Sequence, residues 1–135
     1  MNTAYYKTMV DAILEKETEK LVRSALRVAW MRWPGKKPVL EKACRETFPK
    51  NKDGSRRKKP FKFYKCACCN SWEFKLKEVQ VDHIVPVGSF KLKHIADYVN
   101  RLFCDLSNLQ VICKKCHKVK NKLENDTRRK AKTLL

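Results

Sequence analysis

The longest pattern of apolar positions lies at the start of the chain. Between residues 5 and 33, apolar side chains recur at intervals of three and four, which is the spacing of one face of an α-helix. They are Tyr6, Met9, Val10, Ile13, Leu14, Leu21, Val22, Ala25, Leu26, Ala29, Trp30 and Trp33. The pattern lapses in the charged run from Glu15 to Lys20. We therefore expect one long helix, or two helices joined in that run, ending before Pro34-Gly35.

Shorter patterns follow this N-terminal segment. They predict, in chain order, a helix over residues 38–48, a strand over 61–64, a strand over 79–85, a helix over 94–103, a strand over 109–112 and a helix from Cys113 onward. Proline at the first position favours the 38–48 helix, and Pro86 and Gly88 end the second strand. This order of elements predicts an α+β fold.

The length and charge of the chain narrow its class. At 135 residues it suits one domain with a modest core. Lys and Arg number 32 against 14 Asp and Glu, which gives a formal net charge of +18. Such an excess predicts a polyanionic partner, and nucleic acid is the first candidate. A membrane is not the expected partner, because no apolar segment reaches the length of a span and the first residues do not resemble a signal peptide.

The basic residues gather in two segments. Residues 50–65 hold eight Lys or Arg and a single acid, Asp53, and we interpret them as an exposed basic loop. Residues 114–132 hold nine Lys or Arg, including Lys114 and Lys115, against Glu124 and Asp126. Both segments are candidates for contact with a phosphate backbone. The alternative is that the first is a solvated linker and that many of these side chains only solvate the fold.

The cysteines predict a structural metal site. Cys66 and Cys69 form one Cys-x-x-Cys pair, and Cys113 and Cys116 form a second pair after 43 intervening residues. Two residues between thiolates let one turn of chain present both sulfurs to a tetrahedral ion, so we expect one structural Zn²⁺ with four thiolate ligands. The alternative is that these cysteines are buried thiols or redox-active pairs.

Three further cysteines fall outside this pattern. Cys68 would leave a one-residue spacing from Cys66, so we assign Cys69 as the ligand and treat Cys68 as a bystander. Cys44 and Cys104 have apolar neighbours, which is typical of small core residues. Free and metal-binding thiols together indicate a reducing compartment, and we expect the cytoplasm of a bacterium or of a phage-infected host cell.

A second constellation lies between and beside the cysteine pairs. Asp82-His83 falls in a predicted strand, Asn108 precedes the next strand, and His117 directly follows Cys116. In motif, order and spacing these residues resemble the HNH endonucleases of the ββα-metal type, in the subgroup with two flanking Cys-x-x-Cys knuckles and closest to small phage and bacterial members. The resemblance covers residues 64–124 and does not extend to the N-terminal sixty residues.

The resemblance implies a role for each residue. His83 would be the general base that deprotonates the attacking water. Asp82 and His117 would bind one catalytic divalent cation, Mg²⁺ or Mn²⁺ ahead of Zn²⁺ or Ni²⁺. Asn108 would fix the loop that carries the base. Candidate substrate contacts are Lys114, Lys115, Lys120 and Asn121. Lys120, Asn121 and Glu124 share the helix face of His117, so they are candidates either for phosphate contact or for support of the metal ligands.

The expected geometry contains one difficulty. Neighbours in a regular strand point to opposite faces. Asp82 and His83 can therefore share a site only if the strand bends or bulges, or if the ion sits at its edge.

Together these features predict a small zinc-stabilised ββα-metal (HNH) domain over residues 64–125. It would follow a helical extension at 1–49 and a basic loop at 50–63, and precede a basic tail at 126–135. We expect a metal-dependent endonuclease or nickase acting on DNA, with double-stranded DNA as the substrate, present as a monomer or as a homodimer through the N-terminal helix. The alternative is a non-catalytic, zinc-stabilised module that binds nucleic acid. Both keep the four cysteines, but only the enzyme needs Asp82, His83 and His117 together.

Overall fold

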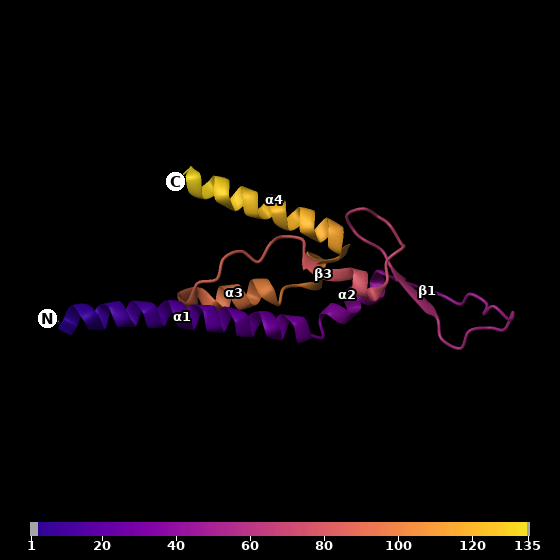
Figure 1. Ribbon diagram of the computed structural model, residues 1–135, viewed down its shortest axis with the longest axis horizontal. Coiled ribbons are helices and arrows are strands. Elements are labelled where there is room, and N and C mark those ends of the chain that lie inside the picture. Colours follow the sequence, from indigo (N-terminus) through magenta and orange to yellow (C-terminus); the bar gives the residue numbers. More distant parts are fainter. Residues whose placement is uncertain (1–2, 135) are drawn as a thin grey trace. The chain divides into compact units, whose positions relative to one another are not determined.

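The computed structural model describes residues 3–134. It combines helices with two small antiparallel sheets, which confirms the expected mixture of α and β elements (Figure 1). Contacts divide the chain into two compact units. The first comprises the chain through Pro34 together with Val85–Asp105, and the second comprises Gly35–Ile84 together with the chain from Leu106 onward.

Within residues 3–134, no helix combines the length and the apolar composition that crossing a bilayer requires.

The first unit is built on one long helix, α1 (Thr3–Arg32), which is drawn in indigo and purple in Figure 1. The charged run at its centre does not interrupt it. Glu and Lys are good helix formers, and Glu17 and Lys20 form an ion pair of 3.2 Å one turn apart. Of the two possibilities left open by the sequence, the structure therefore has the single helix.

Val85–Asp105 packs against α1 within the same unit. It contains α3 (Ile95–Leu102), whose Tyr98 and Leu102 are buried. Trp33 at the end of α1 meets the ring of Phe103 edge-on, with ring centroids 5.4 Å apart. The backbone N–H of Leu92 donates a hydrogen bond of 3.0 Å to the Glu19 carboxylate. These contacts involve the C-terminal half of α1.

The second unit begins with α2 (Lys36–Lys42) and a two-stranded sheet, β1 (Cys44–Thr47) and β2 (Phe61–Tyr64). The predicted helix over residues 38–48 is wrong beyond Lys42. Residues 44–47 instead pair with 61–64, from Cys44 opposite Tyr64 to Thr47 opposite Phe61. A pairing partner supplied from farther along the chain outweighs the local helical pattern.

The basic segment between β1 and β2 turns back through a tight loop. Gly54 has a φ of +84°, a conformation that favours glycine. The N–H of Ser55 donates to Asp53 Oδ1 at 2.9 Å, which closes the turn. Most residues of the segment are exposed, as expected for a basic loop.

A second sheet and a terminal helix complete this unit. β3 (Val79–His83) and β4 (Leu109–Cys113) are antiparallel, and α4 (Lys114–Thr133) follows β4 without a break. Tyr64, Val79 and Val111 form one buried cluster, and Cys66, Ile112 and Cys113 form another. The end of β4 and the start of α4 therefore share a small buried cluster with Cys66 of the first cysteine pair.

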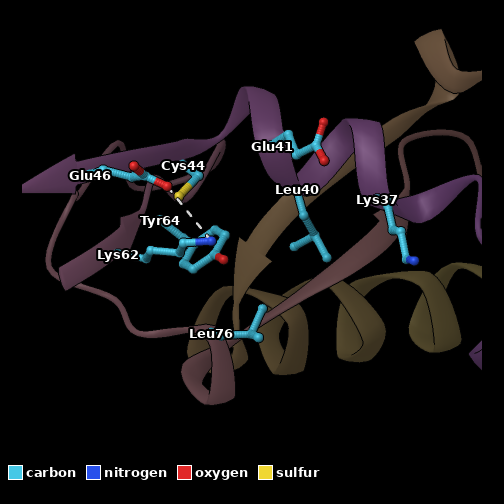
Figure 2. A pocket seen from close by; sticks show the side chains of 8 residues that line it. All are labelled: Lys37, Leu40, Glu41, Cys44, Glu46, Lys62, Tyr64 and Leu76. Atoms are coloured by element: carbon cyan, nitrogen blue, oxygen red, sulfur yellow. Dashed lines mark ion pairs between the residues drawn. The ribbon is translucent and has the colours of Figure 1, made fainter. Parts of the chain in front are cut away.

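A concavity of about 370 Å³ opens beside β1 and β2 in the second unit (Figure 2). Leu40, Tyr64 and Leu76 line its apolar part, and an ion pair of 3.7 Å joins Glu46 and Lys62 at its side. Burial, and next the neighbouring Cys44, raise the pKa of the Tyr64 hydroxyl. None of the residues lining this concavity is a site candidate from the sequence.

Candidate metal centre and adjacent polar cluster

The four cysteines predicted as ligands converge in the second unit. The sulfur atoms of Cys66, Cys69, Cys113 and Cys116 all lie within 4.8 Å of one another. A tetrahedral zinc ion with bonds of about 2.3 Å requires sulfurs separated by roughly 3.8 Å, so a small adjustment accommodates it. Cys66 and Cys113 are buried, whereas Cys69 is exposed. The donor set suits a structural zinc ion with no position left open for substrate.

Local backbone structure presents each pair. The N–H of Cys69 donates to Cys66 Sγ at 3.5 Å, and the N–H of Cys116 donates to Cys113 Sγ at the same distance. Asn70, which directly follows Cys69, has a φ of 59°. Asparagine tolerates this left-handed conformation better than most residues. Cys113 is both the last residue of β4 and the N-cap of α4. The second pair therefore ties the strand to the helix.

The pKa values of two thiols reflect their crowding. Burial acts to raise the pKa of Cys66, but N–H groups of Cys69, Cys113 and Cys68 stabilise its thiolate and lower the value to about 6. Hydrogen bonding to Cys113, together with burial, raises the pKa of Cys116 to about 12. Without a cation, a thiolate in this cluster opposes ionisation of its neighbour. Four thiolates together require a positive ion, as a zinc site supplies.

The other cysteines lie outside the cluster. Cys68 is exposed. Partial desolvation of its thiol raises its pKa, and the charge of Cys66 raises it further. Cys44 and Cys104 are half-buried. The structure thus separates the four expected ligands from these three residues, as the spacing predicted.

A polar cluster joins the end of β3 to the first turns of α4. Asp82 Oδ1 lies 3.8 Å from His117 Nε2. Their side chains are 14% and 29% exposed, so both are largely enclosed yet reachable from solvent. His117 follows Cys116 directly, so the cysteine cluster fixes the part of α4 that carries it.

Lys120 stands at the centre of this cluster. Its Nζ donates to the backbone carbonyl of His83 at 2.9 Å and forms an ion pair with Glu124. It also forms an ion pair of 2.9 Å with Asp82 Oδ2, an enclosed carboxylate oxygen. Burial alone would lower the pKa of Lys120, but Glu124 and Asp82 together raise it.

The sequence leaves two roles open for Lys120, phosphate contact and support of the metal ligands, and its surroundings favour the second. The Lys120 side chain is only 20% exposed and bridges β3 and α4. Glu124, which shares its helix face, is its partner one turn away.

His83 and Asn108 lie where the two strands meet. β3 and β4 keep a regular register through Asp82 opposite Gln110 and His83 opposite Leu109. Alternation therefore places His83, which is 7% exposed, on the opposite face from Asp82. No bulge interrupts this register within β3, which ends at His83. The carbonyl of Asn108 accepts the N–H of Ile84 at 2.8 Å, fixing the chain just after the histidine.

The remaining candidates lie along α4. Asn121 Nδ2 is 3.4 Å from the ring nitrogens of His117, so this amide lies against the imidazole. Lys114 and Lys115 are exposed in the first turn. A concavity of about 460 Å³ follows the same helix. It is lined by Cys68, Gln110, Lys115, Cys116, Val119, Lys120, Leu123 and Glu124.

Comparison with known proteins adds no relative. No protein family model, characterised protein or solved structure matches the chain. The residues of the site and their geometry therefore carry its interpretation.

Proposed function

We propose that this chain is a divalent-metal-dependent DNA endonuclease or nickase of the HNH type, in which a structural zinc ion holds a ββα-metal domain together. The observation that carries the proposal is the approach of Asp82 and His117 to 3.8 Å, from a strand and from a helix that begins at the cysteine cluster. An exposed Asp-His pair without such support would be ordinary surface. Here two separate elements bring a carboxylate oxygen and an imidazole nitrogen to one place.

Asp82 and His117 would hold the catalytic ion, Mg²⁺ or Mn²⁺. Two protein ligands leave several positions for water and a phosphate oxygen, which suits these ions better than a closed site does. When bound, the ion would act as a Lewis acid on the scissile phosphate and stabilise the leaving 3′ oxygen. Asp82 Oδ1, which lies toward His117 Nε2, would be the ligand atom, while Oδ2 is held by Lys120.

His83 would act as the general base. A neutral imidazole can accept the proton of an attacking water near neutral pH. The peptide unit that joins it to Ile84 is held at both of its polar atoms, by Lys120 at the carbonyl of His83 and by the carbonyl of Asn108 at the N–H of Ile84. Because Asp82 and His83 face opposite sides of β3, the phosphate would lie at the end of the strand, where both side chains can approach it.

The zinc cluster and the charge of the chain supply the remaining parts. Cys113 and Cys116 would anchor the start of α4, so that His117 leaves a fixed point toward the ion. Exposed basic residues, Lys114 and Lys115 among them, would contact the backbone of duplex DNA. With a net charge of +18, such contacts position the nucleic acid without specifying its sequence.

Nicking of supercoiled plasmid by the zinc-loaded chain in Mg²⁺ or Mn²⁺ tests this proposal. We expect His83→Ala to lower the rate at least about 100-fold, the usual range for losing a general base. His94→Ala is the matched control, because His94 is exposed and outside the cluster, and it should retain the unmodified rate. If the unmodified chain binds zinc and DNA but cuts no more than His83→Ala, the non-catalytic alternative is correct.

A further inference from the structure

We infer that α1 is a dimerisation element that pairs with α1 of a second copy in an antiparallel coiled coil. The contact would be a seam of Val10, Leu14, Glu17, Leu21, Ser24, Val28 and Met31, which alternate at intervals of four and three residues. This is the repeat of the a and d positions of a coiled coil, kept over three-quarters of a helix that ends at Arg32.

The apolar members of this seam are open to solvent. Val10, Leu14, Leu21, Val28 and Met31 are each between 47% and 71% exposed. Tyr6 extends the stripe toward the N-terminus, Ile13 widens it, and both are more than half exposed. No residue of α1 is buried within the described part of the chain. A continuous apolar stripe of this length on a small protein is typical of a surface that meets a partner.

The seam lies on the opposite side of α1 from the face used by its own unit. Glu19, Val22, Leu26 and Trp30 are the partly buried positions of the helix, and they follow one another at intervals of three and four. At 100° per residue their face is centred about half a turn away from the seam. The helix therefore has two separate apolar faces, and packing within the chain uses only one.

The charges of α1 favour an antiparallel second copy. All four acids, Asp11, Glu15, Glu17 and Glu19, lie in its first part, and residues 20–32 contain four basic residues and no acid. A parallel pair in register would place Glu17 against Glu17 of the partner subunit inside the seam, and each basic segment against its copy. An antiparallel pair with Val10 opposite the partner's Val28 places Glu17 opposite the partner's Leu21 and beside the partner's Lys20. Opposite charges then meet at the centre.

Sedimentation equilibrium of the zinc-loaded full chain tests the pairing. We expect a dimer whose dissociation constant rises at least about 100-fold in Leu21→Asp, because a charge would enter the seam twice. Leu123→Asp is the matched control, since Leu123 is a leucine of α4 with 62% exposure, and it should leave the dimer intact. Dimerisation through α1 does not depend on nuclease activity, so this result and the plasmid result can fail separately.

Charge reversal tests the orientation. Glu17→Lys should weaken the dimer about tenfold, and the double variant Glu17→Lys/Lys20→Glu should restore it, because the two exchanged side chains would again carry opposite charges where the copies meet. Helix content measured by circular dichroism should stay constant in each variant. A chain that remains monomeric up to about 100 µM, or that loses its dimer equally in Leu123→Asp, overturns the inference. A dimer that Glu17→Lys does not weaken overturns the antiparallel orientation.

Discussion

Lys120 connects the strand and the helix of the proposed active site. Its ammonium group contacts Asp82 and the carbonyl of His83 in β3, and Glu124 in α4. An ammonium group in this position offsets two carboxylates and fixes the backbone of the proposed base. Its role in the proposal is therefore to position Asp82 and His83, rather than to bind a phosphate.

Lys120→Met tests this role at the scale of one residue. The substitution leaves two enclosed carboxylates without their cation, so we expect a loss of stability of about 1–3 kcal/mol. The turnover rate at saturating DNA should fall about 10-fold or more, and DNA affinity should change little. Lys118→Met is the matched control because Lys118 is exposed on the same helix, and its turnover should be unchanged. If Lys120→Met weakens DNA binding but keeps the turnover rate, Lys120 is a phosphate contact after all.

Among the elements, the cysteine cluster joins β4 and α4 to the segment that directly follows β2. The two Cys-x-x-Cys turns lie on either side of residues 70–112 and share a buried environment with Ile112. The apolar clusters of this unit are small, with three buried residues in each. Metal binding is therefore expected to supply a large part of the folding free energy of the second unit.

Replacing a single thiol should show this dependence. We expect the unmodified chain to hold one zinc ion, and Cys113→Ser to lose that ion and to unfold at a temperature at least about 10 °C lower. Cys68→Ser and Cys44→Ser are matched controls outside the cluster and should keep both the metal and the melting temperature. Zinc content measured by atomic absorption and melting followed by circular dichroism give the two readings. Equal stability of Cys113→Ser and Cys68→Ser would contradict a structural zinc site.

Sequence patterns predicted the elements wherever the signal is local. The spacing of the cysteines predicted which four of the seven lie together, and the apolar periods predicted β3, β4, α3 and the start of α4. The pattern failed after Lys42, because Cys44–Thr47 pairs with a strand that lies beyond the basic loop. The contacts of Lys120 with Asp82 and with the carbonyl of His83 were not predictable either, because a lysine in a basic helix is normally solvated and these two partners come from β3.

The molecule as a whole combines two compact units formed by interleaved parts of the chain. Val85–Asp105, between β3 and β4, belongs with α1, whereas both strands and α4 belong with the cysteine cluster. The proposed catalytic residues all lie in the second unit, and the proposed dimer seam lies in the first. Each unit can therefore be altered separately, and the seam variants should leave the chemistry at Asp82 and His117 in place.

The dependence of single-turnover plasmid nicking on Mn²⁺ concentration measures ion binding and chemistry at Asp82 and His117 together. For the zinc-loaded chain we predict a rate that saturates with Mn²⁺ and is abolished by removing the loosely bound ion. His117→Ala should need at least about 10-fold more Mn²⁺ for half-saturation, since it loses one of two protein ligands, whereas His94→Ala should match the unmodified chain. Nicking that needs no added divalent ion, or the same Mn²⁺ dependence in His117→Ala, would contradict a catalytic ion held by Asp82 and His117.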